Sequence, residues 1–395
     1  MPTPGRPSHL PLRFPVSESS LTARPPLPEE QKHEVTPLEL FFDLVFVYGV
    51  SQLSHHLLEH LTWRGAAETL VLLLAIFTVW SYTSWETTIT SVTRAVSRAK
   101  MLAVMLPGLF MNAFIPEAFG ASAWAFVLPY LAIQLGRSVW TLLSTHSPLF
   151  RKHFTNYLIW ILATAPLWVV GASADEQTRL SWWAAATAID FLGAALAHPL
   201  PGRSISTENV GFDGDHMVER ARLFLIIALG ETVLVTGTAI SEAPPTWMTV
   251  LTGSAGLLMS VSLWSLAFGR PNAVAVRDLE ETRNPIRAAM YAVNSMTGIV
   301  AGLILLAVGI EKVIVHSNGH SSLALNLLVF GGPALVLLMQ TWYVWVLTRT
   351  VSHPRLLGAA ALLVACPLTL SAPPFVSLVL ALALLGAVAL GELEG

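Results

Sequence analysis

Charged residues are scarce in this chain: they make up 12 % of its 395 residues, whereas hydrophobic residues make up 54 %. Soluble globular proteins carry roughly 25 % charged residues, which cover the surface that faces water. The charges here are too few for such a surface, but the composition suits a surface that faces hydrocarbon. The sequence therefore predicts an integral membrane protein whose first partner is the lipid bilayer.

Cysteine is nearly absent, and Cys366 alone excludes both an intrachain disulfide and a metal cage built from cysteines. A net charge of −3, with no stripe of basic and aromatic residues, argues against a nucleic-acid partner. No phosphate-binding loop, dinucleotide-binding glycine pattern or zinc-protease motif occurs. His55, His56 and His60 with Glu59 could bind a metal, but their place at a helix end favours an interfacial role. We expect no cofactor and no metal.

Hydrophobic runs, in contrast, are abundant and long. A helix needs roughly 20 apolar residues to cross the ~30 Å hydrocarbon core. Segments of this kind predict an all-α integral membrane protein with about 12 transmembrane helices. They lie near 37–57, 66–90, 100–117, 122–145, 154–174, 180–199, 216–240, 246–268, 286–312, 322–347, 355–371 and 374–391. Whether the last two are both full spans is left open.

Residues 1–36 are polar and rich in proline, and we expect a disordered cytoplasmic tail there. Most of the 22 Lys and Arg residues fall in connections on the side of this tail, and only Arg64, Arg179 and Lys312 fall in connections on the other side. Basic residues mark the cytoplasmic side of a membrane protein. The bias predicts a multi-pass protein of the cell (inner) membrane with both termini in the cytoplasm.

The two sets of six segments, residues 37–200 and 216–391, resemble each other. Leu40-Phe41 matches Leu223-Phe224, and Trp80-Ser81 matches Trp264-Ser265, at nearly the same spacing. Because each set has an even number of helices, both would insert in the same orientation. This arrangement predicts two parallel six-helix repeats with a functional site between them.

Two acidic residues stand out in the first predicted helix. Glu39 and Asp43 are four residues apart, so they share one face of the helix. A charge in hydrocarbon is costly, which makes such residues functional candidates by default. The alternative is that both reach the interface and only anchor the helix.

The seventh helix opens with His216, Glu219, Arg220 and Arg222. In the repeat alignment Arg222 falls on Glu39, so an acidic face should meet a basic face across the axis. Such pairing makes charges tolerable in lipid. An interdomain salt bridge without chemistry is the alternative, because structural ion pairs follow the same rules.

Glu231 lies deeper in the same helix, about 20 Å from its cytoplasmic end at ~1.5 Å per residue. It must be protonated, paired or facing water, so we expect either a structural hydrogen bond or a proton- or ion-linked role.

Glu86, Arg137 and Asp190 are embedded in the first set, and we expect Arg137 and Asp190 to pair. The last five helices contain few membrane-embedded polar residues, Gln340 among them, so we expect the second set to serve more as a scaffold.

Several motifs strongly resemble the low temperature requirement protein A family. In chain order they are Glu39-Leu-Phe-Phe-Asp43-Leu-Val-Phe46, Met111–Phe119, Gln134-Leu135-Gly136-Arg137, Ala188-Ile189-Asp190-Phe191, Pro201-Gly202-Arg203-Ser204 and the run from His216 to Glu231. The resemblance covers residues 34–312 and implies a bacterial multi-spanning membrane protein, linked by name to growth in the cold. The family often has a His where this chain has Asn294, so chemistry of that His does not carry over.

The candidate proton-linked or acid groups are Glu39, Asp43 and Glu231, and three classes of function are open for them. The first is a transporter or channel, which could be proton-linked, for a small ion or a lipid-like substrate. The alternative is a membrane-embedded enzyme that uses buried carboxylic acids on a lipid or isoprenoid, in a pocket lined by Trp80, Trp85, Trp264 and Tyr82. A binding or sensory protein without turnover is a third.

The candidate binding residues are Glu39, Asp43, Glu86, Arg137, Asp190, His216, Glu219, Arg220, Arg222 and Glu231. Substrate and oligomeric state stay open.

Overall fold

The computed structural model describes residues 35–90, 95–145, 147–196, 198–201, 214–269 and 285–394. The predicted tail 1–36 and the end of the Pro201–Ser204 motif lie largely outside these residues. The first six helices are α1 (Pro37–Glu59), α2 (Trp63–Thr90), α3 (Ala95–Ala113), α4 (Ala123–Ser144), α5 (Pro148–Ser173) and α6 (Glu176–Ala195). The remaining elements are α7 (Gly214–Glu242), α8 (Trp247–Phe268), α10 (Pro285–Val315), α11 (Leu323–Asn326), the π-helical turn η1 (Leu327–Gly331), α12 (Gly332–Thr348), α13 (His353–Leu368) and α14 (Pro374–Glu394).

The part of the chain that is described is all-helical, as predicted for an all-α membrane protein. It contains twelve helices when α11, η1 and α12 are counted as the single apolar helix that they form. Eight of the described helices are long and apolar enough to cross a membrane. With 16 residues, α13 would span only ~24 Å at ~1.5 Å per residue, which is less than the hydrocarbon core. The arrangement as two repeats stays a prediction.

The start of α1 is fixed by a capping box. The Thr36 hydroxyl accepts a hydrogen bond from the backbone amide of Glu39, and the Glu39 carboxylate accepts one from the Thr36 amide at 2.8 Å. Pro37 occupies the first helical position, where its missing amide hydrogen costs nothing. Asp175 caps α6 in a related way, and its hydrogen bonds from Thr178 and Gln177 lower the pKa of this exposed carboxyl. The cap on α1 matters most, because it holds the Glu39 side chain in place.

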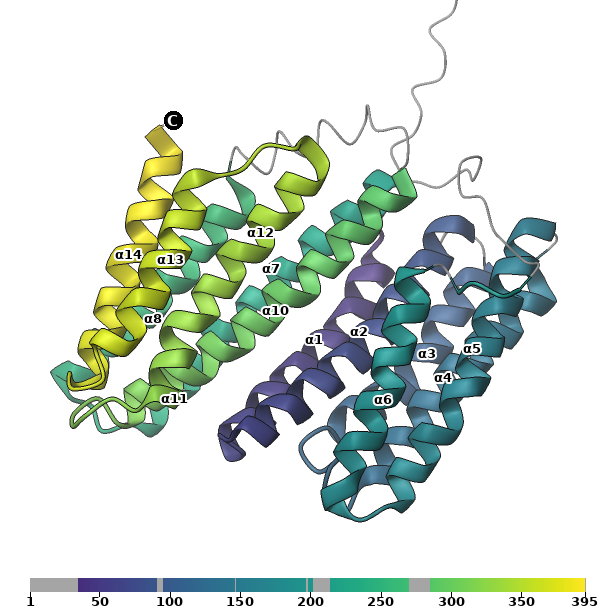
Figure 1. The fold of residues 1–395 in the computed structure, drawn as a ribbon, viewed down its shortest axis with the longest axis horizontal. Coiled ribbons are helices and arrows are strands. Elements are labelled where there is room, and N and C mark those ends of the chain that lie inside the picture. The colour runs from purple at the N-terminus through teal and green to yellow at the C-terminus, as the bar shows by residue number, and fades with distance from the viewer. Residues whose placement is uncertain are drawn as a thin grey trace, which may run out of the picture. The chain divides into compact units, whose positions relative to one another are not determined.

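Neighbours in sequence pack together within the first six helices and within the later ones (Figure 1). Contacts between these two groups come mainly from α1, which touches both α7 and α10, and from α2. Phe42 of α1 and Trp80 of α2 are fully buried there, and Phe224 of α7 packs edge-on against Trp80 at 4.9 Å between ring centroids. The interface between the two groups therefore has an aromatic core.

Close packing of α10 against η1 and α12 depends on two glycines. A Cβ atom on Gly302 would lie 2.7 Å from the carbonyl oxygen of Gly332, and one on Gly332 would lie 2.7 Å from the oxygen of Gly302. The backbones meet directly, as the G-x-x-x-G spacing of Gly298 and Gly302 suggests for helices in membranes.

Candidate functional site

A cluster of ionisable side chains joins α1 to α7 near the start of both helices. Glu39 and Asp43 stand one turn apart on α1, and His216 and Arg220 stand one turn apart on α7. His216 Nε2 lies 2.9 Å from Glu39 Oε1, and Arg220 donates a hydrogen bond of 2.8 Å from Nη2 to Asp43 Oδ1. Arg220 Nη1 also lies 3.6 Å from Glu39 Oε1. Two carboxylates thus face two basic groups in a ladder that both helices build.

Helix α2 completes this α1–α7 cluster with uncharged hydrogen-bonding groups. Trp80 Nε1 donates to Asp43 Oδ1 at 2.7 Å, and Arg220 Nη1 donates to Thr87 Oγ1 at 3.2 Å. The side chains of Glu39, Asp43 and Arg220 are fully buried. The guanidinium also lies 5.6 Å from the centre of the Phe42 ring, within the range of a cation–π contact. Such burial is tolerable only because every charge has an opposite charge or a donor beside it.

The predicted contact between an acidic face of α1 and a basic face of α7 does form, but Arg222, which the repeat alignment set at the position of Glu39, takes no part in it. Arg222 lies on another side of α7, where its Nη1 is 3.5 Å from Glu219 Oε2 and both side chains are half-exposed. Successive residues of a helix turn by about 100°, so Arg222 points well away from the direction of Arg220. His216 and Arg220 take the place at α1 that the alignment gave to Arg222.

A second polar network lies inside the first six helices, around Glu86 of α2. Glu86 pairs with Arg137 of α4 through Oε1, and with Lys100 of α3 through Oε2 at 3.1 Å. Thr141 of α4 also donates to Oε2, at 2.7 Å. Side chains from α3 and α4 therefore converge on one buried carboxylate of α2.

The predicted pair of Arg137 with Asp190 does not form. Arg137 Nη2 donates to Gln134 Oε1 at 2.9 Å and to the Tyr157 hydroxyl at 2.8 Å, in addition to its pair with Glu86. Asp190 instead accepts hydrogen bonds from uncharged groups. These donors are Thr164 at 2.8 Å, Trp168 at 3.4 Å and Tyr130 at 3.4 Å. Hydroxyl and indole donors suffice for this carboxyl, which leaves the arginine to Glu86.

Glu231 does not belong to either network. Among the described residues no hydrogen bond or ion pair of Glu231 is present, and its side chain is half-buried. Eleven residues are about three turns of a helix, so Glu231 and Arg220 project from nearly the same side of α7. At the level of Glu231 that side is open, since Leu234 is 66 % exposed. The side of α7 that is buried against α1 near Arg220 is therefore only partly covered at Glu231.

The histidines at the end of α1 serve to hold the chain together. His56 Nδ1 lies 3.1 Å from the Pro116 carbonyl oxygen, and Nε2 lies 3.4 Å from Glu68 of α2. The His60 ring stacks on His56. Within the described ranges no group of three or more His, Cys, Asp or Glu side chains could hold a metal ion.

An apolar cavity of about 570 Å³ lies at the other end of the interface between the two helix groups. One wall is the end of α1 and the start of α2, with Leu57 and Leu70, and the other is α10 with α11, η1 and α12, including Ile304 and Leu328. Leu57 is 18 residues beyond Glu39, or ~27 Å along α1 at ~1.5 Å per residue. The cavity and the α1–α7 cluster therefore occupy opposite ends of the same contact.

The later helices are not free of buried charge. Arg355 of α13 is fully buried and makes two hydrogen bonds to the carboxylate of Glu392 in α14, at 2.7 and 2.8 Å. It also donates to the Leu266 carbonyl at 3.0 Å. The sequence predicts a helix that begins at Arg355, and a basic residue at a helix end is expected to reach water and to need no buried partner.

Several partners escaped prediction because they carry no charge in a hydrophobic run. Thr87, Thr141 and Tyr157 gave no signal beyond their polarity. Trp80 was expected near the acids of α1 and does donate to Asp43, whereas Trp264 is half-exposed and its ring is tilted against that of Phe268.

An all-α fold with this many apolar helices, and with ion pairs buried between them, defines a multi-pass membrane protein. The chain belongs to the bacterial low temperature requirement A protein (LtrA) family, whose model matches residues 34–390. The predicted resemblance is confirmed, and the match extends past residue 312 to the last helix. An uncharacterized protein of Rhizobium meliloti (strain 1021) is 30 % identical over 329 residues, which are 82 % of this chain and 80 % of that protein. No solved structure matches the chain.

Proposed function

We propose that this protein is a membrane transporter for an apolar or amphipathic molecule, and that it works by moving its first six helices against the later ones. One observation carries the proposal. The contact between the two groups is held by the α1–α7 cluster at one end, and it contains a large apolar cavity at the other. A transporter that is closed on one side of the membrane and accessible from the other has this arrangement.

The α1–α7 cluster has the properties of a reversible closure. Separation of α7 from α1 would leave Glu39 and Asp43 without their cations, and breaking a buried pair costs about 3–5 kcal/mol. Water or protons that reach the two carboxylates would offset much of this cost. Opening would then depend on water reaching Glu39 and Asp43, whereas the half-buried Glu231, which has no ion pair among the described residues, is the group that would link a proton to the movement.

The cavity supports a substrate with a large apolar part. Its volume of about 570 Å³ falls within the ~300–1,000 Å³ that ligand pockets occupy. Leucines dominate its walls, and Thr62, Thr69 and the Trp63 indole are the polar side chains among the lining residues. Such walls could not replace the water shell of an ion, so a lipid-like molecule fits better than a small ion.

The orientation also belongs to this proposal. The excess of Lys and Arg on the side of the N-terminus supports cytoplasmic termini in the inner membrane. The α1–α7 cluster would then be a cytoplasmic closure, and the cavity would open toward the outer face. The proposed movement treats the two six-helix groups as parallel repeats.

The enzyme alternative is less well supported. An acid that protonates a lipid must reach the reacting atom. No lining residue of the apolar cavity carries a carboxyl group, and Glu39 and Asp43 lie at the opposite end of α1.

Transport can be tested in proteoliposomes that carry a phospholipid labelled with nitrobenzoxadiazole. Dithionite added outside quenches labels in the outer leaflet only, so transfer between leaflets is read from the fluorescence lost. We expect transfer faster than in protein-free liposomes, with a rate that depends on a pH gradient. Glu231→Gln should fold and lose this pH dependence, because Glu231 is half-buried and has no hydrogen bond or ion pair among the described residues.

Glu242→Gln is the matched control, because Glu242 is an exposed acid at the end of the same helix. It should behave like the wild type. Transfer no faster than in empty liposomes would contradict transport of a lipid-like molecule. Unchanged pH dependence in Glu231→Gln would remove Glu231 from the mechanism.

A further inference from the structure

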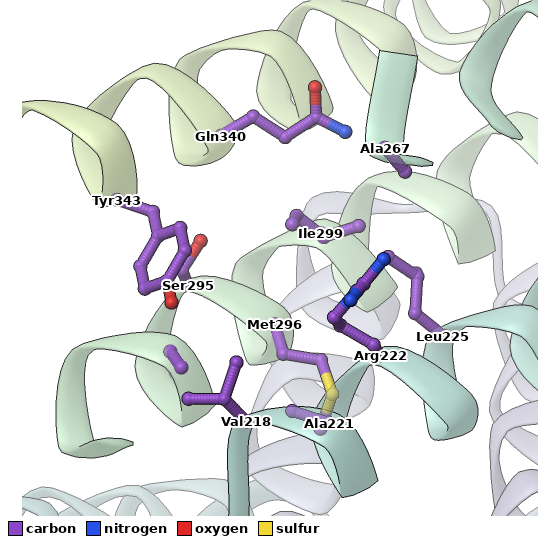
Figure 2. A pocket seen from close by; sticks show the side chains of 11 residues that line it. Val218, Ala221, Arg222, Leu225, Ala267, Ser295, Met296, Ile299, Gln340 and Tyr343 are labelled. Atoms are coloured by element: carbon purple, nitrogen blue, oxygen red, sulfur yellow. The ribbon is translucent and has the colours of Figure 1, made fainter. Parts of the chain in front are cut away.

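A second, smaller cavity of about 70 Å³ lies within the later helices, between α7, α8, α10 and α12 (Figure 2). Gln340 of α12 lines it and is only 2 % exposed. Among the described residues neither amide atom of Gln340 has a hydrogen-bond partner, and the buried hydroxyl of Tyr343 has none either. Three polar atoms from one face of α12 therefore stand unpaired at a cavity.

Unpaired polar atoms of this kind call for a ligand. Buried side-chain polar atoms are nearly always hydrogen-bonded in native proteins, because an unpaired one loses its water without compensation. A single water needs roughly 10–15 Å³ of such space, so about 70 Å³ can hold a molecule of several heavy atoms. Gln340 and Tyr343 would regain hydrogen bonds when such a molecule is bound.

The charge around the cavity indicates the sign of that molecule. Arg222 of α7 lines the cavity with its guanidinium, and no carboxylate is among the lining residues. Its contact with Glu219 is long, at 3.5 Å, and half-exposed, so it contributes little. The Ser295 hydroxyl already donates to the Met339 carbonyl at 3.0 Å. The donors at the cavity are thus the unpaired Gln340 amide and Tyr343 hydroxyl, together with the Arg222 guanidinium that Glu219 shares.

We propose that this cavity binds a small monovalent oxyanion of the size of formate or bicarbonate. Arg222 would supply the charge, and the Gln340 amide and the Tyr343 hydroxyl would donate hydrogen bonds to the oxygen atoms. Hydrogen bonds to charged groups are stronger than those between neutral groups, which favours an anion over water in this setting. The inference is independent of the proposed transport, since the site lies within one helix group.

Formate is a suitable probe because its single carbon-bound proton gives an isolated NMR signal. Saturation-transfer difference spectra of the full chain in detergent micelles, at constant ionic strength, should show transfer from the protein to formate. Formate should also raise the thermal unfolding temperature. Arg222→Gln should weaken binding about ten-fold or more, since it removes a charged donor.

Gln340→Leu should abolish both effects while unfolding no earlier than the wild type, because it removes the unpaired amide without changing the side-chain size greatly. Tyr343→Phe is a milder variant that keeps the fold and should weaken binding. The matched control is Arg349→Gln, an exposed cation at the end of α12, which should bind formate normally. Absence of transfer in the wild type, or equal transfer in Arg222→Gln, Tyr343→Phe and Arg349→Gln, would overturn the proposal.

Discussion

Replacement of Arg220 by glutamine is expected to lower the free energy of unfolding by about 3–5 kcal/mol, the usual cost of removing one partner from a buried ion pair. Arg220 is fully buried and bonds to Asp43 at 2.8 Å, with Glu39 at 3.6 Å and Thr87 at 3.2 Å. Without it, the Trp80 indole, at 2.7 Å, is the one donor to Asp43 left among the described residues. The loss would be a large share of the roughly 5–15 kcal/mol that stabilises a typical domain.

Denaturant unfolding in detergent micelles measures this loss, and Arg222→Gln is the matched control. Arg222 stands two residues further along α7 and is half-exposed, so its replacement should change stability by no more than about 0.5 kcal/mol. Adding Asp43→Asn to Arg220→Gln should restore part of the loss, because the two residues share one interaction. Similar losses for Arg220→Gln and Arg222→Gln would contradict the pairing.

Arg137→Gln should have an effect of the same size, about 3–5 kcal/mol, for the same reason. Arg137 pairs with Glu86 and also donates to Gln134 and Tyr157. Its guanidinium lies over the rings of Tyr82 and Tyr157, at 5.3 and 5.2 Å from their centres. Glu86 would lose its arginine partner while Lys100 and Thr141 remain beside it, and two helices of the first group would lose a shared anchor.

Asp190→Asn tests whether Arg137 pairs with Glu86 and not with Asp190, because the donors to Asp190 in the described part of the chain are all neutral. An amide oxygen can still accept from Thr164, so a loss of about 1 kcal/mol is expected. The same unfolding assay compares the two variants. If Arg137 and Asp190 formed an ion pair after all, both substitutions would cost several kcal/mol.

The helices could be predicted because their signal is local. A bilayer demands about 20 apolar residues per crossing, and each run of this length became a helix. The predicted segment 37–57 became Pro37–Glu59, and 374–391 became Pro374–Glu394. Glu39 and Asp43 were identified in the same way, since a carboxylate in such a run is conspicuous.

The partners of these residues could not be predicted, because pairing depends on how helices rotate and pack. Arg220 rather than Arg222 faces α1, since their directions on α7 differ by about 200°. Arg137 pairs with Glu86 of α2, and nothing in the sequence indicated that α2 would lie beside α4. Gln340 is one polar residue in an apolar helix, and nothing in its sequence surroundings indicated a cavity.

The central claim is that the α1–α7 cluster holds the two helix groups together at one end while an open cavity lies between them at the other. Pulsed electron paramagnetic resonance measures the relevant distances on spin-labelled cysteines in a Cys366→Ala background. One label pair replaces Trp63 and Leu323, exposed residues at the cavity, and the other replaces Phe41 and Trp264, exposed residues at the opposite end.

Glu39→Gln combined with Asp43→Asn, which removes the negative charges at the cluster, should lengthen the Phe41–Trp264 distance and shorten the Trp63–Leu323 distance relative to the wild type. If the protein stays folded and both distance distributions are unchanged, the cluster does not close one side of a moving pair of helix groups.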